Sequence, residues 1–226
     1  MIRRDYLLRQ VEEFVAAIAK MAGLAKNQQW QEASQAADAQ FQALAGADAA
    51  ELLQLSETDL LARVVQGEPT HVVENKIFML ATLFKAQGDL LAGQDKREAS
   101  RPYYLKGLHL LLDTFAQSQM AKRPDFLPTV EAFLIGLHDA PLPLRTQALL
   151  MRHYEQIGEY AKAEDALFTM METEPANAEL LSFGAAFYQR LLPLSDEKLA
   201  GGNLPRAEVS AGLGELKARQ ARLNPA

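Results

Sequence analysis

The histidines and their acidic neighbours are the side chains of this sequence that could hold a metal ion. His71 lies three residues before Glu74, and His109 lies four residues before Asp113. Either spacing lets a pair share one helix face. A zinc site needs at least three protein ligands, and no third ligand is identifiable for either pair. His109 also lies among leucines, where a hydrogen-bonded core histidine is the commoner outcome. We therefore predict no metal site.

Motifs for catalysis or cofactor binding are not recognisable in the sequence. The chain has no cysteine, which excludes disulfides, thiolate nucleophiles and thiolate zinc sites. Neither a Gly-x-Ser-x-Gly elbow, nor a zincin motif, nor a Walker motif is present. The segment "GLGEL" around Gly212 lacks the third glycine of a dinucleotide fingerprint and follows no predicted strand. We expect a non-enzymatic protein without a cofactor.

One basic and aromatic stretch, "DKREASRPYYLKGLHLLL", has the ingredients of a nucleic-acid surface. Its cations and tyrosines are Lys96, Arg97, Arg101, Tyr103, Tyr104 and Lys106. Such residues can contact phosphates and stack on bases. The formal net charge of −6, however, gives no electrostatic support to general binding of nucleic acid or anionic membrane. A polar loop that leads into a helix with inward tyrosines is the favoured interpretation.

The elements that position these residues are predicted to be helices. Leu, Ala, Gln and Glu dominate while Val, Ile and Thr are sparse, and no run alternates with the period of a strand. The first helix, 3–23, has an apolar stripe formed by Leu7, Val11, Phe14, Ile18 and Met21. The stripe is expected to pack within its own chain, although homodimerisation through this helix stays open.

Further helices follow along the whole chain. Three of them have a recognisable boundary signal: a short helix is capped by Ser56, the helix 72–87 is closed by "QGD", and another runs from Pro128 to 138. The other predicted helices are 28–45, 100–118, 144–157, 160–173, 178–192 and 205–223. A short helical turn is expected near Asp196. Pro141 and Pro143 disfavour helix in the residues before them. We therefore predict one all-helical domain, 1–226, with a sub-boundary at 139–144 that separates 1–139 from 144–226.

Membrane insertion and export are not expected. No stretch reaches the roughly 18 apolar residues of a membrane helix. The apolar residues near the N-terminus are preceded by Asp5, Glu12 and Glu13 and interrupted by Lys20, unlike the unbroken core of a secretory signal. A cytoplasmic location is the expectation.

Residues 147–177 resemble a tetratricopeptide repeat, a helix–turn–helix unit of 34 residues. The matching positions are Leu150, Tyr154, Gly158, Tyr160, Ala163, Leu167 and Pro175. The first helix of a further unit follows, with Tyr188 at the position that Tyr154 has in the clear unit. A Gly-rich stretch then stands where the second helix of that unit is expected. Upstream, a degenerate unit has Phe84 and Gly88 in the tyrosine and glycine positions at the end of its first helix. The resemblance implies an all-α, short and irregular helical-repeat array with a C-terminal capping helix.

The N-terminal part carries a second resemblance. The segments "MIRRDYLLRQVEEFVAAIAKMAGL", "WQEA" and "LLQLSETDLL" are similar to an uncharacterised bacterial family of small helical proteins. This likeness spans roughly residues 1 to 120 and implies a bacterial, helical, repeat-like protein. It brings no activity with it.

The repeat resemblance implies a concave groove lined by the first helix of each unit. The residues expected to face it are Asn75, Lys85, Arg145, Arg152, Glu155, Gln189 and Arg190. We predict an adaptor or scaffold whose groove binds an acidic or C-terminal carboxylate segment of an unidentified protein or peptide. Two alternatives stay open: these residues are ordinary surface charges, or the protein is a ligand-sensing regulator with a small-molecule pocket between helices.

Overall fold

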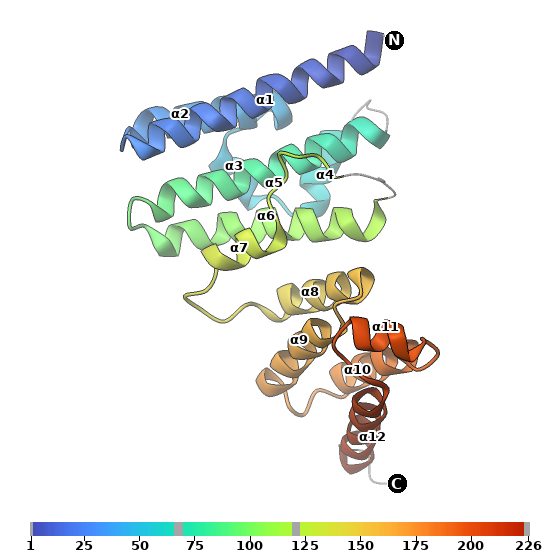
Figure 1. The fold of residues 1–226 in the computed structure, drawn as a ribbon. Helices are drawn as coiled ribbons and strands as arrows, with labels where there is room; N and C mark the ends of the chain where they lie inside the picture. Colours follow the sequence, from blue (N-terminus) through green and yellow to red (C-terminus); the bar gives the residue numbers. More distant parts are fainter. Residues whose placement is uncertain (1, 66–69, 119–122, 224–226) are drawn as a thin grey trace. The chain divides into compact units, whose positions relative to one another are not determined.

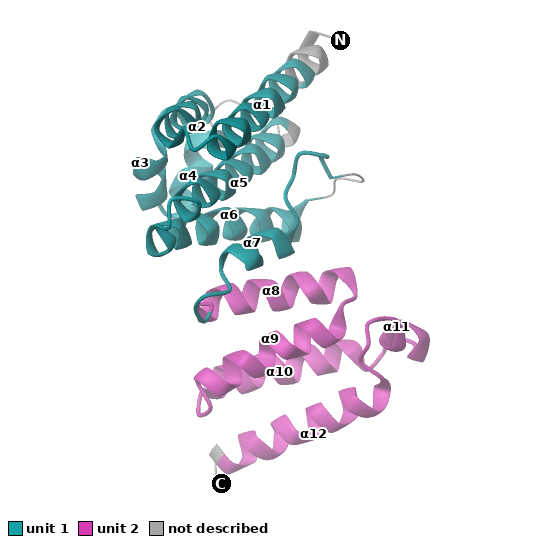
Figure 2. Ribbon diagram, turned by 60° about the vertical axis from the view of Figure 1, so that its left-hand side comes forward, with its two compact units in different colours: residues 1–141 teal, residues 142–226 magenta. Residues whose placement is uncertain are grey.

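The computed structural model describes residues 2–65, 70–118 and 123–223, and their side chains except those of 2–7, 70, 71 and 223 (Figure 1). Over these ranges the chain is all-α, as predicted, and contains no strand. It divides into two compact units, 1–141 and 142–226 (Figure 2), and the division falls within the predicted segment 139–144. Within the described ranges, no helix combines the length and apolar character needed to cross a lipid bilayer.

Unit 1 is built around one long helix, α5. Its helices are α1 (Ile2–Lys26), α2 (Trp30–Ala45), α3 (Ala49–Gln54), α4 (Glu57–Val65), α5 (Thr70–Ala92), α6 (Arg97–Gln117) and α7 (Val130–Gly136). Helix α5 contacts α1, α2, α4, α6 and α7, and it runs alongside α6 for most of its length (Figure 1). Phe41 of α2 and Phe84 of α5 are both fully buried, with ring centroids 5.0 Å apart. This apolar contact forms part of the core of unit 1.

Side-chain caps decide where two helices of unit 1 begin. The Ser56 hydroxyl accepts a hydrogen bond from the Asp59 N–H (3.0 Å) and donates one to its carboxylate (2.7 Å), so the predicted cap before α4 is confirmed. Helix α7 begins later than predicted. Thr129 is its cap, with its hydroxyl accepting from the Ala132 N–H (3.2 Å), and Pro128 therefore precedes the helix instead of lying in its first turn.

Gly88 does not end a helix, contrary to the prediction. Helix α5 continues through it to Ala92, and the chain turns only before α6, where Asp95 has a φ of 60°. A Cβ at Gly88 would lie 2.8 Å from the ring of Tyr104, so the glycine serves a close approach of α5 and α6. The Tyr104 hydroxyl then donates a hydrogen bond to Asp89 (2.9 Å). The helix end and the turn predicted at Gly88 are therefore wrong.

Unit 2 contains α8 (Leu144–Ile157), α9 (Tyr160–Thr173), α10 (Ala178–Leu191), α11 (Asp196–Gly201) and α12 (Arg206–Leu223). The bounds of α8 and α9 agree with the prediction. Gly158 has a φ of 81° in the turn between them, and Ala163 is fully buried. A Cβ at Gly184 of α10 would meet Leu167 of α9 and Leu216 of α12. Helix α10 therefore packs between α9 and α12.

Helix α11 lies between α10 and α12, where the sequence predicted a Gly-rich stretch in place of a repeat helix and a short helical turn near Asp196. Helix α11 is that turn. The guanidinium of Arg206 stabilises the start of α11 by donating hydrogen bonds to the carbonyl of Leu192 (2.7 Å) and to the carboxylate of Asp196 (2.5 Å). At the end of α11, the carbonyl of Gly202 accepts a hydrogen bond from the N–H of Ala161 (3.0 Å). The segment between α10 and α12 is thus tied to the start of α9.

The partial burial of the Glu164 carboxylate in unit 2 makes the stability depend on pH. The Tyr188 hydroxyl donates to the Glu164 carboxylate (2.5 Å), and burial raises the pKa of Glu164 above its ordinary value. The native state therefore binds a proton more readily than the unfolded chain, and ionised Glu164 costs stability as pH rises. We expect the stability of Glu164→Gln relative to wild type to increase from about pH 4 to about pH 7, because only the wild type loses stability as Glu164 ionises. Urea denaturation at both pH values checks this, with Glu172→Gln, exposed on the same helix, as the control.

Candidate functional site

A surface depression lies between α8 and α10 of unit 2. It has a volume of about 460 Å³. Its lining residues are Arg152, Glu155 and Gln156 of α8 and Phe183 and Arg190 of α10. Two guanidinium groups, one carboxylate and one aromatic ring therefore face a common space, which suits a ligand that carries both charge and apolar surface.

An ion pair across the two helices organises this depression. The Nε and Nη2 atoms of Arg190 donate to the two carboxylate oxygens of Glu155 at 2.7 and 2.8 Å. The Glu155 side chain is 19% exposed and that of Arg190 is 49% exposed. This two-point hydrogen bonding raises the pKa of Arg190 and fixes the plane of its guanidinium. The pair therefore presents one edge of the guanidinium in a defined orientation.

The structure brings together three of the predicted groove residues, Arg152, Glu155 and Arg190. Arg145 and Gln189 are exposed on the same two helices, but they do not line the depression.

Two lining residues escaped the sequence prediction. Phe183 lies seven residues before Arg190, so heptad spacing along α10 places both on one stripe and could have revealed it. Gln156 lies four residues after Arg152, so the helical repeat of α8 places both on one face and could have revealed it as well.

The other two predicted groove residues belong to unit 1. Asn75 is only 8% exposed, because the neighbouring helices cover α5 on several sides. It is not the exposed groove residue that the repeat resemblance implied. Lys85 makes an ion pair with Asp89, four residues along α5, at an Nζ–Oδ2 distance of 2.7 Å. The depression in unit 2 is lined without either residue.

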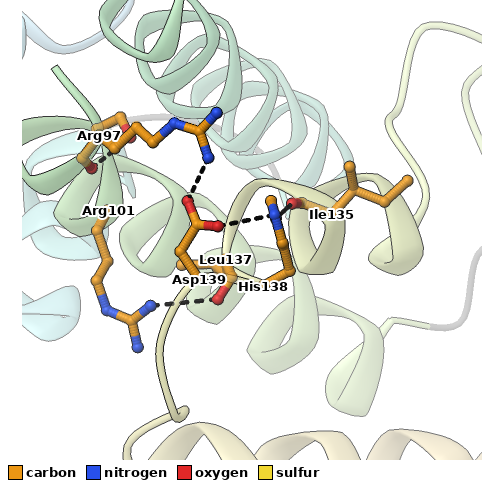
Figure 3. A network of polar contacts seen from close by, with 7 residues as sticks. Arg97, Arg101, Ile135, Leu137, His138 and Asp139 are labelled. Atoms are coloured by element: carbon orange, nitrogen blue, oxygen red, sulfur yellow. Dashed lines mark hydrogen bonds and ion pairs between the residues drawn. The ribbon is translucent and has the colours of Figure 1, made fainter. Parts of the chain in front are cut away.

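The basic stretch at the start of α6 anchors the segment that follows α7 (Figure 3). Arg97 donates to the Asp139 carboxylate (2.7 Å), and this hydrogen bond lowers the pKa of Asp139. Arg101 donates to the carbonyls of Leu137 (3.2 Å) and Pro141 (2.5 Å). Because these guanidinium groups are engaged by their own chain, the two arginines have a structural role at the end of unit 1.

Of the remaining members of that stretch, Tyr103, Tyr104 and Lys106 pack within unit 1, whereas Lys96 is exposed. Lys106 is 8% exposed and donates to the carbonyl of Leu55. Tyr104 is 3% exposed, and the Tyr103 ring lies 6.3 Å from that of Phe84. These positions agree with the interpretation of inward-facing tyrosines on a helix.

His109 is the core histidine that its leucine-rich surroundings predicted. Its side chain is 11% exposed, and its Nδ1 lies 3.4 Å from Oε1 of Glu57. The side chain of His71 lies outside the described residues, so the predicted His71–Glu74 pair is not described. Among the described residues, no group of three His, Cys, Asp or Glu side chains is arranged to hold a metal ion.

The outer face of α1 exposes two large apolar side chains. Leu8 is 54% exposed and Val15, seven residues later, is 43% exposed. The inward residues Phe14 and Met21 are buried, as the predicted stripe requires. Homodimerisation through this helix stays a prediction.

Comparison with known proteins identifies similarity to one family model. A model described as a family of unknown function, DUF6483, matches residues 1–221. No curated protein and no solved structure matches the chain significantly. The prediction that the chain resembles an uncharacterised family is confirmed. The match extends well beyond residues 1 to 120, to which the predicted resemblance was limited.

Proposed function

The chain belongs to the DUF6483 family, whose function is unknown, and we propose that it is a non-enzymatic adaptor whose unit 2 binds an acidic segment of a partner protein. The observation that carries the proposal is the depression lined by Arg152, Phe183 and the Arg190–Glu155 pair. A guanidinium group is well suited to two-point recognition of a carboxylate.

The order of helices in unit 2 supports a repeat-like groove. Helices α8 and α9 form one hairpin, and α10 and α12 pack together as a second pair, with α11 inserted between them. We interpret these as two tetratricopeptide-like units. The lining of the depression comes from α8 and α10, which are the first helices of the two units. That is the face on which such repeats bind peptides.

The chemistry of the depression favours an acidic occupant over a basic one. Two guanidinium groups outnumber the single Glu155 carboxylate, which is itself held by Arg190. The pair engages the Nε and Nη2 side of Arg190, and the Nη1 atom lies on the other edge of the same planar group. A partner carboxylate can therefore bind between Arg152 and Arg190, while an apolar side chain packs on Phe183.

The test is a charge reversal with a matched control. The tagged protein is used to capture partners from its native host, and the acidic segment of a captured protein is then synthesised as a peptide. We expect Arg152→Glu to weaken peptide binding about tenfold or more, because a carboxylate would then face a carboxylate. Isothermal titration calorimetry measures the affinity. Lys217→Glu on α12, exposed and outside the depression, makes the same charge change and should leave the affinity unaltered.

Two further outcomes bear on the proposal. A peptide whose Asp and Glu residues are replaced by Asn and Gln should lose binding to the wild-type protein. Phe183→Ala should weaken binding of a peptide that carries an apolar residue beside its acidic ones. If Arg152→Glu and Lys217→Glu have equal effects, the depression is not the binding surface and the adaptor proposal for unit 2 fails.

A further inference from the structure

The depression of unit 2 contains a guanidinium group with which no described residue pairs. Arg152 is exposed, and within the described ranges its side chain takes part in no hydrogen bond or ion pair. Arg190, by contrast, gives its Nε and Nη2 edge to Glu155. The ring of Phe183 is partly exposed and contacts no other described aromatic ring. Arg152 and Phe183 are therefore the two groups of the lining that an occupant can engage without displacing a contact.

Glu155 sets the charge of the depression. The lining carries two guanidinium groups and one carboxylate, which leaves a single net positive charge. Glu155 is held through both of its oxygens and is 19% exposed, so its negative charge stays beside the binding surface. One carboxylate of an occupant balances the net charge, whereas a second negative charge at the same point is repelled by Glu155. Glu155 therefore acts as a selectivity residue for singly charged groups.

The length of α10 between its two lining residues sets the spacing of the occupant's groups. Phe183 and Arg190 lie seven residues apart, which is about 10 Å along the helix axis. In an extended segment, residues i and i+2 point to the same side and lie about 7 Å apart. The bonds of an acidic side chain span the remaining distance of about 3 Å. Adjacent residues of an extended segment point to opposite sides, so they cannot both face the depression.

The lining favours an extended occupant over a helical one. A helical ligand binds through a row of apolar anchors that enter a hydrophobic groove. The depression offers one aromatic ring, Phe183, among charged and polar lining residues. It therefore suits an extended segment with a single apolar anchor.

From these charges and spacings we propose that the depression recognises an extended segment in which one acidic residue lies two positions from an aromatic or large aliphatic residue. The inference rests on the proposed function and specifies its partner segment. The acidic side chain binds Arg152 and the Nη1 edge of Arg190, and the apolar side chain packs on Phe183. Glu155 disfavours a doubly charged group in the place of the single carboxylate.

The spacing is tested with short blocked peptides, titrated against the full chain by ligand-observed NMR. Ac-Gly-Asp-Gly-Phe-Gly-NH2 and its reverse, Ac-Gly-Phe-Gly-Asp-Gly-NH2, carry the proposed spacing in the two chain directions. Ac-Gly-Asp-Phe-Gly-Gly-NH2 has the same composition with the two residues adjacent, and an Asn-for-Asp version of each spaced peptide lacks the charge. We expect the better spaced peptide to bind about fivefold more tightly than the adjacent and uncharged ones, in line with a partly exposed ion pair.

A substitution ties this preference to the aromatic ring. Phe183→Ala should remove the difference between the spaced and adjacent peptides, because the apolar anchor then has no partner. Equal binding of the spaced, adjacent and uncharged peptides to the wild-type protein would overturn the proposal, as would the lack of saturable binding by either spaced peptide.

The role of Glu155 is tested through the charge of the acidic residue. Phosphoserine in place of Asp in the better spaced peptide carries a charge of about −1.5 to −2 at pH 7. Glu155→Gln should shift the ratio of the two affinities toward the phosphoserine peptide about fivefold. A loss of packing alone would weaken both peptides and leave this ratio unchanged. Glu172→Gln, exposed on α9 and outside the lining, is the charge control, and an equal shift in both variants, or none in Glu155→Gln, would refute the selectivity.

The variant Arg152→Glu separates this inference from the proposed function. If the spaced and adjacent peptides bind equally while Arg152→Glu still weakens binding of the captured partner's segment, the spacing is wrong and the adaptor proposal stands. If Arg152→Glu has the same effect as Lys217→Glu on both kinds of peptide, the inference and the adaptor proposal fail together. Far-UV circular dichroism confirms that each variant is folded.

Discussion

Phe84→Ala is expected to lower the free energy of unfolding by about 3–5 kcal/mol, the largest effect among our predictions. Phe84 is fully buried in α5, where its ring lies 5.0 Å from that of Phe41 and 6.3 Å from that of Tyr103. Its removal leaves a cavity between α2, α5 and α6 that the neighbouring rings cannot close. Urea denaturation followed by the fluorescence of Trp30, the single tryptophan of the chain, measures the loss in unit 1.

The control for this substitution is an exposed apolar residue of the same unit. Ile135 is 72% exposed, so Ile135→Ala should change the stability by no more than about 0.5 kcal/mol. A small effect of Phe84→Ala, comparable with that of Ile135→Ala, would mean that α2, α5 and α6 do not enclose this ring.

Gly202→Ala is expected to destabilise the protein by about 3 kcal/mol. A Cβ at Gly202 would lie 2.3 Å from the carbonyl oxygen of Gly158 and 2.3 Å from the ring of Tyr160. The φ of Gly202 is −90°, which alanine adopts easily, so the cost arises from this steric clash and not from backbone strain. The clash would also disturb the hydrogen bond from Ala161 N–H to the Gly202 carbonyl. Thermal unfolding monitored by circular dichroism reports the effect.

The adjacent residue provides a matched control. Nothing lies within 4 Å of a Cβ at Gly201, and Gly201 is the last residue of α11. Gly201→Ala should therefore be neutral or stabilising by a few tenths of a kcal/mol, about the helix propensity gain expected at a helix end. Similar destabilisation by both substitutions would contradict the docking of α11 against the turn between α8 and α9.

Local signals in the sequence were sufficient for the helix class and for several helix boundaries. The cap at Ser56, the left-handed turn at Gly158 and the breaks at Pro141 and Pro143 each depend on residues close in the chain. Such signals act through backbone geometry and short-range hydrogen bonds, which is why they can be recognised without knowledge of the fold.

Where distant residues compete with a local signal, the same reasoning fails. Gly88 indicated the end of a helix, but the ring of Tyr104 packs at that position and α5 continues through it. After α10, the short helical turn expected near Asp196 is present as α11, but the sequence did not indicate that Arg206 and the start of α9 hold it in place. At Gly88, a contact made by another helix outweighs the preference of the local residues.

The candidate sites show the same division. Spacing along one helix was enough to place Arg152 and Glu155 on a common stripe, because that depends only on the helical repeat. The pairing of Glu155 with Arg190, 35 residues away, is decided by how α8, α9 and α10 pack within unit 2. The burial of Asn75 was likewise beyond the sequence. The sequence determines which side chains share a helix face, but only the tertiary structure decides which faces become buried, because burial depends on how all the helices of a unit share one apolar core.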